Sequence, residues 1–149
     1  MEIERKFTIR SLPAGLEQYP SHLIEQGYLN TDPVIRIRRE DEQYYLTYKG
    51  KGLLAREEYN LPLTPEAYAH LLPKADGVII SKRRYLIPLP PYTIELDVFC
   101  APFAPLIIAE VEFPTEEEAR AFCPPEWFLE DVTMDPAYHN STLSARQDI

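Results

Sequence analysis

Charged and apolar residues alternate along most of the extended segments of this chain. Near the start, Glu2, Glu4 and Lys6 occupy every second position, with Ile3 and Phe7 between and after them. A β-strand points successive side chains to opposite faces, so such a strand has one charged face and one mainly apolar face. The same alternation recurs in V-I-R-I-R, S-K-R-R-Y, T-I-E-L-D-V-F and A-E-V-E-F. The pattern leaves one question, which of the two faces is the interior.

Strands are predicted wherever β-branched or aromatic residues are bounded by turn residues. The predicted strands span residues 2–10, 33–40, 43–49, 55–61, 79–87, 92–99 and 106–113. Asp41-Glu42 and Gly50-Lys51-Gly52 are typical of the turns that join neighbouring strands. Consecutive strands with short connections predict an antiparallel sheet.

Helices are expected in fewer places. Thr64 followed by Pro65 predicts a helix over 65–72, and Thr115 with Glu118 forms a capping box that predicts a helix over 116–122. Asp135 caps a predicted C-terminal helix that starts at 136 and runs to about Arg146. A further helix is predicted around 16–26. The fold class is therefore α+β with a dominant antiparallel sheet.

Length and composition limit the possible roles of the protein. A chain of 149 residues with 45% apolar residues predicts a single domain over 1–149. The charged start and the lack of a long apolar run predict a cytoplasmic protein without signal peptide or membrane anchor. Cys100 and Cys123 lack the spacing of a metal site or a disulfide framework. The net charge of -9 argues against nucleic acid and membrane partners, unless the basic residues are enclosed together.

The charged faces admit two interpretations. For any single strand, an ordinary half-exposed sheet with its charges in water explains the alternation. Taken together, the strands favour a closed barrel whose solvated lumen holds the charges. The charges on these faces are balanced: Lys6, Arg36, Arg38, Lys49, Arg56, Lys82 and Arg84 against Glu2, Glu4, Glu58, Glu95, Asp97, Glu110 and Glu112.

A charged lumen of this kind suits a polyanion and a metal ion. Several cations in one channel match a chain of phosphates, and the guanidinium fork of arginine can bond two phosphate oxygens. Clustered carboxylates are costly unless a cation joins them, and Mg²⁺ characteristically bridges carboxylates to phosphates.

These segments resemble the CYTH domains, also called triphosphate tunnel metalloenzymes. The resemblance starts with the E-x-E-x-K strand at residues 2–6 and covers nearly the whole chain in order. It continues through Q-G-Y-L (26–29), R-I-R (36–38), T-Y-K-G (47–50), K-R-R-Y (82–85), I-E-L-D-V-F (94–99), A-E-V-E-F (109–113) and D-V-T-M-D-P-A-Y-H-N (131–140). One departure is Asn60, where relatives often carry a glutamate.

The resemblance implies an eight-stranded antiparallel β-barrel, a tunnel with a charged lumen and helices packed outside. It implies a metal-dependent hydrolase of small triphosphates with Mg²⁺ or Mn²⁺, most similar to small inorganic triphosphatases. The implied metal ligands are Glu2, Glu4, Glu110 and Glu112. The implied phosphate-binding residues are Lys6, Arg36, Arg38, Lys49, Arg56, Lys82 and Arg84. The residues expected to take part in catalysis are Glu4, Lys6, Lys82 and Tyr28.

Several assignments stay open at this point. Tyr28 is either a residue at the tunnel mouth or a packing residue. Glu95 and Asp97 are placed to bind metal, to act as a base, or to pair with Lys82 and Arg84, and pairing is the favoured expectation. Tyr138 and Asn140 are expected to fix the C-terminal helix rather than touch substrate. The three histidines, His22, His70 and His139, are expected on the surface or in helix packing.

Two other functions remain compatible with the same residues. A class IV adenylyl cyclase would hold ATP with the same cations and metal, and a non-catalytic module would only bind polyphosphate or a nucleotide. The two pairs of glutamates argue against a simple anion binder, since it would gain little from carboxylates near its ligand. The oligomeric state, monomer or homodimer, is not set by these patterns.

Overall fold

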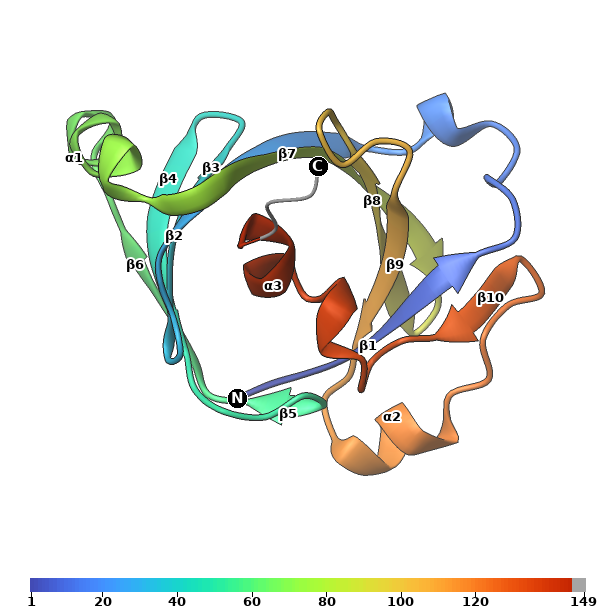
Figure 1. The fold of residues 1–149 in the computed structure, drawn as a ribbon. Coiled ribbons are helices and arrows are strands. Elements are labelled where there is room, and N and C mark those ends of the chain that lie inside the picture. The colour runs from blue at the N-terminus through green and yellow to red at the C-terminus, as the bar shows by residue number, and fades with distance from the viewer. Residues whose placement is uncertain (146–149) are drawn as a thin grey trace.

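The computed structural model describes residues 1–145, which form one antiparallel sheet rolled into a nearly closed barrel (Figure 1). The strands are β1 (Glu2–Ile9), β2 (Ser21–Thr31), β3 (Val34–Glu40), β4 (Gln43–Lys49), β5 (Ala55–Arg56), β6 (Glu58–Pro62), β7 (Asp76–Leu89), β8 (Tyr92–Phe99), β9 (Ile107–Glu112) and β10 (Phe128–Asp131). Their order in the sheet is β10-β1-β9-β8-β7-β2-β3-β4-β6, with β5 paired to β1.

The helices are short. The α-helices are α1 (Pro65–Leu71), α2 (Glu116–Ala121) and α3 (Asn140–Ser144), and the 3₁₀ turns are η1 (Leu16–Gln18), η2 (Leu72–Lys74) and η3 (Pro136–Tyr138). The predicted caps of α1 and α2 are confirmed, because Thr64 accepts from the amide of Ala67 and Thr115 from the amide of Glu118. No helix that the structure describes is both long enough and apolar enough to cross a lipid bilayer.

The barrel closes through the segment that holds β5 and β6. β6 pairs with β4, and β5 pairs with β1, where Arg56 lies opposite Glu2. One segment therefore joins the two ends of the sheet. The predicted antiparallel barrel is confirmed with ten strands instead of eight, because this segment counts as two strands and the short β10 adds to the edge of β1.

The charged face of the strands is the inside. On β1, Ile3 and Phe7 belong to an apolar core outside the barrel wall that includes Ala119 of α2 and Phe128 of β10. Lys6, on the opposite face of the same strand, is 5% exposed and points inward. The expected helices α1 and α2 lie outside the barrel (Figure 1). The alternation of the sequence thus separates a dry outer core from a charged lumen.

The helix predicted over 16–26 is wrong. Gly15, with φ of 68°, leads into the single turn η1, and the chain then extends as β2. β2 pairs on both sides, with β3 and with β7, so its backbone groups are satisfied by distant strands. This non-local pairing outweighs a weak local helical preference.

The C-terminal helix is shorter than predicted. Asp135 caps as expected, by accepting from the amide of Ala137, but only the turn η3 follows. His139 is extended, with φ of -81° and ψ of 139°, and separates η3 from α3. The predicted end near Arg146 lies outside the described residues.

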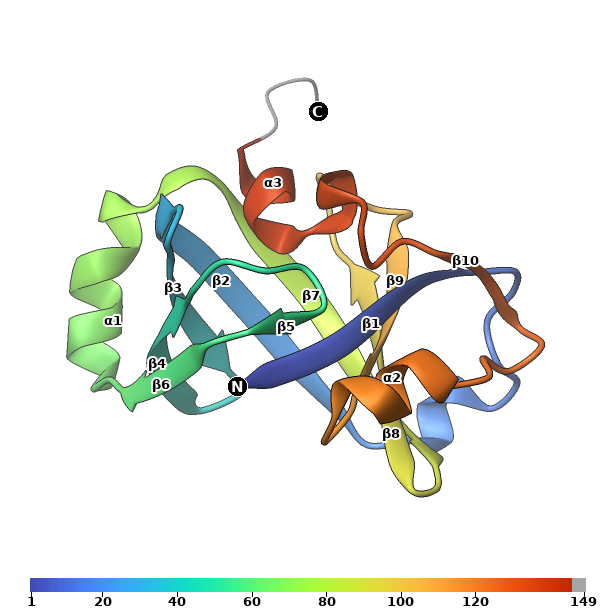
Figure 2. The ribbon, with the colours of Figure 1, turned by 90° about the horizontal axis from the view of Figure 1, so that it is seen from below.

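Unlike the other helices, α3 lies over one end of the barrel, within its outline in one view and above its rim in the other (Figures 1 and 2). Leu143 of α3 is 2% exposed and packs with Ile80, Phe99 and Ile108. These three residues lie two positions from the inward charges of β7, β8 and β9. The inner face is therefore apolar beneath α3 and charged beyond it, so that α3 seals this end.

Candidate active site in the barrel lumen

A polar cavity of about 450 Å³ occupies the barrel. Its lining includes all but one of the predicted site residues: Glu2, Glu4, Lys6, Tyr28, Arg36, Arg38, Lys49, Arg56, Arg84, Glu110 and Glu112. Lys82 is the exception, because it is fully buried behind the lining. The structure thus brings the predicted metal ligands and phosphate-binding residues to one place.

The register of the strands explains this convergence. On β1, Glu4 lies opposite Glu112 and Lys6 lies opposite Glu110, both from β9. On the next pair of strands, Glu95 of β8 lies opposite Glu110. Because cross-strand partners lie within about 5.5 Å of each other, inward residues at matched positions form continuous rows across the wall.

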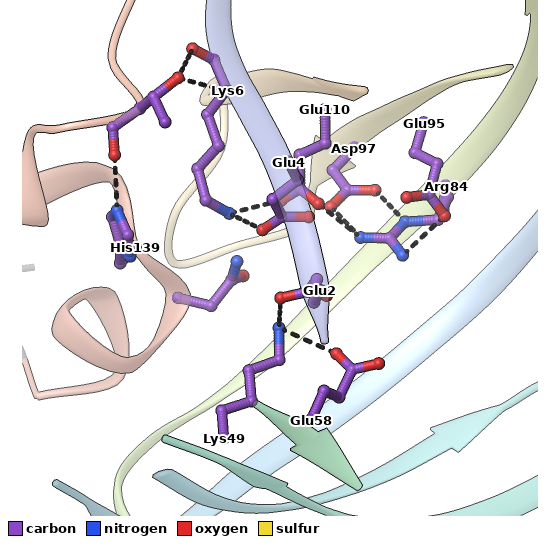
Figure 3. Close-up of polar contacts among 12 residues, drawn as sticks. Glu2, Glu4, Lys6, Lys49, Glu58, Arg84, Glu95, Asp97, Glu110 and His139 are labelled. Carbon is purple, nitrogen blue, oxygen red and sulfur yellow. Dashed lines mark hydrogen bonds and ion pairs between the residues drawn. The ribbon is translucent and has the colours of Figure 1, made fainter. Parts of the chain in front are cut away.

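Lys6 is held between two acids. Its Nζ lies 2.8 Å from Oε1 of Glu110 and 3.3 Å from Oε1 of Glu4 (Figure 3). Burial alone would lower the pKa of Lys6, but the two carboxylates outweigh it and raise that pKa above its usual range. Lys6 is therefore a permanent cation in the lumen.

Lys49 of β4 also lies between two carboxylates. Its Nζ lies 2.8 Å from Glu2 and 3.4 Å from Glu58 (Figure 3). Glu2 comes from β1 and Glu58 from β6, so this ammonium connects the two strands between which the barrel closes.

Asp97 is the centre of a third group. Its Oδ1 accepts from Nε of Arg84 at 2.7 Å and its Oδ2 from Nη2 at 2.9 Å, a two-bond contact (Figure 3). Oδ2 also lies 2.7 Å from Nζ of Lys82, and Arg84 further contacts Glu95 at 3.1 Å. The expected pairing of Glu95 and Asp97 with these cations is confirmed. Burial would raise the pKa of Asp97, yet Arg84 and Lys82 hold it below its usual value.

The arginines of the opposite wall have far fewer acidic partners. Arg36 of β3 donates to Thr47 at 3.1 Å, while its buried Nε has no hydrogen-bond partner. Arg38 is bonded to Gln26 at 2.8 Å, and its nearest acid contact is 3.9 Å long. Burial and the neighbouring Arg38 lower the pKa of Arg36. Within residues 1–145, no acidic group lies within 4.0 Å of the charged nitrogens of Arg36 or Arg56.

The acids on β1 and β9 are crowded. Burial, followed by repulsion from Glu110, raises the pKa of Glu4, and burial with repulsion from Glu2 and Glu4 raises that of Glu112. Oxygen ligands with excess negative charge fit a hard divalent cation. Among residues 1–145, however, no three acidic, histidine or cysteine side chains already meet as a preformed metal site.

Comparisons with known proteins agree with this arrangement. The model of the CYTH domain matches residues 1–135. The chain belongs to the CYTH domain family. A curated inorganic triphosphatase from Nitrosomonas europaea is 40% identical over 148 residues, with 96% of each chain covered. One from Acetivibrio thermocellus is 36% identical, with 95% of this chain and 92% of the relative covered.

A solved structure shows that the fold is also shared. The crystal structure of an inorganic triphosphatase superposes on this CYTH domain with a TM-score of 0.74 and 36% identity. It covers 99% of this chain and 96% of the other. This chain therefore shares its overall fold with a protein named as an inorganic triphosphatase.

Tyr28 is a packing residue at the sealed end that also lines the cavity. The side chain is 3% exposed and packs in the apolar cluster under α3 with Leu143, yet it also lines the cavity. Its hydroxyl accepts from Nε2 of Gln26 at 3.3 Å, which connects it to the partner of Arg38. Tyr28 therefore stands at the boundary between the apolar seal and the charged lumen.

The C-terminal segment of this CYTH domain contributes to the cavity in a way that its sequence did not predict. His139, Asn140 and Ser141 line the cavity, although His139 was expected on the surface or in packing. Its Nε2 lies 3.1 Å from the carbonyl of Thr133, and burial lowers its pKa. The D-P-A-Y-H-N motif marked this segment as part of the family pattern, but no periodicity indicated that it enters the barrel end.

Proposed function

We propose that this CYTH protein is a metal-dependent triphosphatase that hydrolyses inorganic tripolyphosphate to phosphate and pyrophosphate. The observation that carries the proposal is the asymmetry of the lumen. The cations of β1 and β7 are already neutralised by carboxylates, whereas Arg36 and Arg38 on β3 and Arg56 on β5 have little acidic compensation. A buried, uncompensated guanidinium is a strong site for an anion.

The lining favours an inorganic substrate over a nucleotide. Within the described lining, the aromatic or aliphatic residues are Tyr28, Val34 and Tyr45, and the others are polar or charged. A nucleobase is bound through stacking and apolar contact, for which these few residues offer little surface. The names of the relatives at 40% and 36% identity support the same substrate.

The arginines of β3 and β5 would bind the phosphate chain. Arg36 and Arg38 lie two positions apart and point inward, so each can offer its fork to successive phosphates. Lys6 lies on β1, and Lys49 lies beside the arginines on β4. Both line the lumen and would neutralise the terminal group as negative charge develops on it. In phosphoryl transfer, positioning and electrostatic stabilisation of this kind supply most of the rate enhancement.

The metal ligands would be Glu2, Glu4, Glu110 and Glu112, and the ion would be Mg²⁺ or Mn²⁺. When bound, such an ion would neutralise phosphate oxygens and lower the pKa of a water molecule. The crowding that raises the pKa of Glu4 and Glu112 is the penalty that a divalent cation would relieve.

Glu95 would accept the proton of the attacking water. Burial raises its pKa to about 7, which is close to the value that suits a general base at neutral pH, and it lines the cavity. The water oxygen forms a bond to the terminal phosphorus, the bond to the bridging oxygen breaks, and pyrophosphate leaves. Lys82, being fully buried, would act from behind the lining by holding Asp97 in place.

Phosphate release from tripolyphosphate, ATP and thiamine triphosphate tests the proposal, with each substrate assayed in Mg²⁺, in Mn²⁺ and in chelator. We expect metal-dependent turnover that is fastest on tripolyphosphate. Release of pyrophosphate from ATP with formation of a cyclic nucleotide would instead identify a cyclase. Tight binding of tripolyphosphate without turnover would identify a binding module.

A further inference from the structure

Asn140 joins the segment that seals the barrel to the charged lumen. It is the first residue of α3, and its Oδ1 accepts a hydrogen bond of 3.0 Å from Nζ of Lys82 on β7. The two residues are 58 positions apart in the chain. This contact is a direct polar connection between α3 and the cation network described above.

Lys82 is linked to the lumen through Asp97 and Arg84. Its side chain is completely buried, with Nζ 2.7 Å from Asp97, which is also completely buried. Asp97 in turn holds Arg84 by two hydrogen bonds, and Arg84 lines the cavity. The four side chains form an unbroken series from the sealed barrel end to a guanidinium that faces the substrate.

The place of Asn140 depends on how α3 is seated. Leu143 packs against Ile80 and Phe99 beneath it. At the same end of α3, the carbonyl of Ser144 lies so close to Gly77 that a Cβ on this residue would clash with it. Because the C-terminal end of this short helix is fixed against β7, the acceptor oxygen of Asn140, one turn away, is held at a defined point.

Lys82 needs that oxygen. Burial lowers the pKa of Lys82 to about 7, and its Nζ carries at least two donors on either side of that value. Removal from water makes each unpaired donor costly. Asp97 satisfies one of them, but its two oxygens are shared with Arg84. Without Asn140, Lys82 would be drawn further onto Asp97 and would compete with Arg84 for the same carboxylate.

We propose that Asn140 is a positioning residue, which transmits the seating of α3 to the phosphate-binding guanidinium of Arg84. It acts through Lys82 and Asp97 and does not react with substrate. The inference rests on the proposed function, because it takes Arg84 as a contact of the phosphate chain. It adds that the sealed end of the barrel sets the geometry of the site and does more than block an opening.

Substitution of Asn140 tests this inference in the full chain. Asn140→Leu keeps the size and removes the acceptor, and we expect it to raise the KM for tripolyphosphate about tenfold. Asn140→Asp keeps an acceptor oxygen, so its KM should stay within about threefold of the wild-type value. Asn30→Leu and Asn30→Asp are the matched controls, because Asn30 is exposed on β2 and does not line the cavity.

The KM is the decisive quantity, since partial unfolding lowers the amount of active enzyme and leaves KM unchanged. Thermal unfolding of each variant verifies folding, and Asn140→Ala replaces the leucine variant if that variant does not fold. Calorimetric binding of tripolyphosphate in chelator gives the same comparison without turnover. A wild-type protein that binds but does not hydrolyse would refute the proposed function and still leave this inference testable.

A double-mutant cycle with Lys82→Met tests the route of the effect. If Asn140 acts through Lys82, Asn140→Leu will change KM or binding by less than about twofold when Lys82 is already absent. The full tenfold effect in that background would overturn the proposal, because it would place Asn140 on a separate route. An unchanged KM and affinity in Asn140→Leu alone would overturn it as well.

Discussion

Glu4 of β1 and Glu112 of β9 are direct partners in the antiparallel ladder, so two carboxylates of like charge face each other across the strands. Like charges at such positions destabilise a sheet. Lys6 contacts Glu4 at 3.3 Å, whereas within residues 1–145 no cationic nitrogen lies within 4.0 Å of Glu112. The pair is therefore a local cost in the metal-free protein, and a divalent cation would turn it into a favourable contact.

Replacing Glu112 by glutamine should have opposite effects without and with metal. In chelator at low salt, Glu112→Gln should raise the melting temperature, because it removes the repulsion from Glu4. With saturating Mn²⁺, the wild type should gain more stability than the variant, because metal bound to the folded state alone stabilises it. Thermal unfolding in both conditions measures this. Glu130→Gln, an exposed change on β10, is the control, and an equal gain with Mn²⁺ in both variants would refute a metal ligand at Glu112.

Arg36 and Arg39 on β3 offer a matched pair, one inward and one outward. Arg36→Lys keeps the charge but loses the fork, so we expect the KM for tripolyphosphate to rise about tenfold or more. Arg39 is exposed and lies against Tyr44, and Arg39→Lys should leave KM unchanged. Steady-state kinetics of the two variants decide the point. Equal KM values would mean that the inward arginine does not bind the phosphate chain.

The raised pKa of Glu95 should be detectable in the pH dependence of stability. Burial raises its pKa from 4.5 in the unfolded chain to about 7, so the folded state binds the extra proton between these values. The contribution of Glu95 to stability should therefore fall as pH rises from about 4.5 to 7 and then level off. In chelator, Glu95→Gln should match the wild type near pH 4.5 and exceed it by about 1 to 2 kcal/mol at pH 8. Denaturant unfolding across this range is the measurement, and parallel curves for both proteins would contradict the shift.

The packing of α3 against the barrel end predicts a contribution to folding stability. Leu143 is 2% exposed in the apolar cluster at the sealed end, so Leu143→Ala should cost about 2 to 4 kcal/mol of unfolding free energy. Leu12→Ala, at a position that is 50% exposed, should change stability by no more than about 0.5 kcal/mol. Chemical denaturation compares the two. A small loss in Leu143→Ala would mean that α3 does not close the barrel end by packing.

The period of two in the sequence predicted much of the fold and most of the lumen. It is a local property of each strand, and it holds here because one face is buried against the outer core while the other encloses charge. β2 was not predicted, because the local pattern of its segment does not match the structure that the segment adopts. Leu16, Tyr19 and Leu23 imitate a helical spacing, and only pairing with β3 and β7 makes the segment a strand.

The sequence also did not predict which of the inward arginines have acidic partners. Arg36 and Arg84 occur in equivalent alternating patterns, yet Arg84 meets Asp97 and Glu95, while in residues 1–145 no acid approaches Arg36 within 4.0 Å. Strand register decides this, and register between distant strands cannot be deduced from one strand alone. The contact of Asn140 with Lys82 was missed for the same reason.

The most direct test of the central claim is ³¹P NMR of tripolyphosphate hydrolysis by the wild type, Glu4→Gln and the control Glu130→Gln, with Mg²⁺ or Mn²⁺ present. We expect the wild type and the control to release one phosphate for each pyrophosphate. We expect Glu4→Gln to lose this activity by about a hundredfold or more, because the residue lies among the clustered acids. No hydrolysis by the wild type, or full activity in Glu4→Gln, would contradict a triphosphatase site in the lumen.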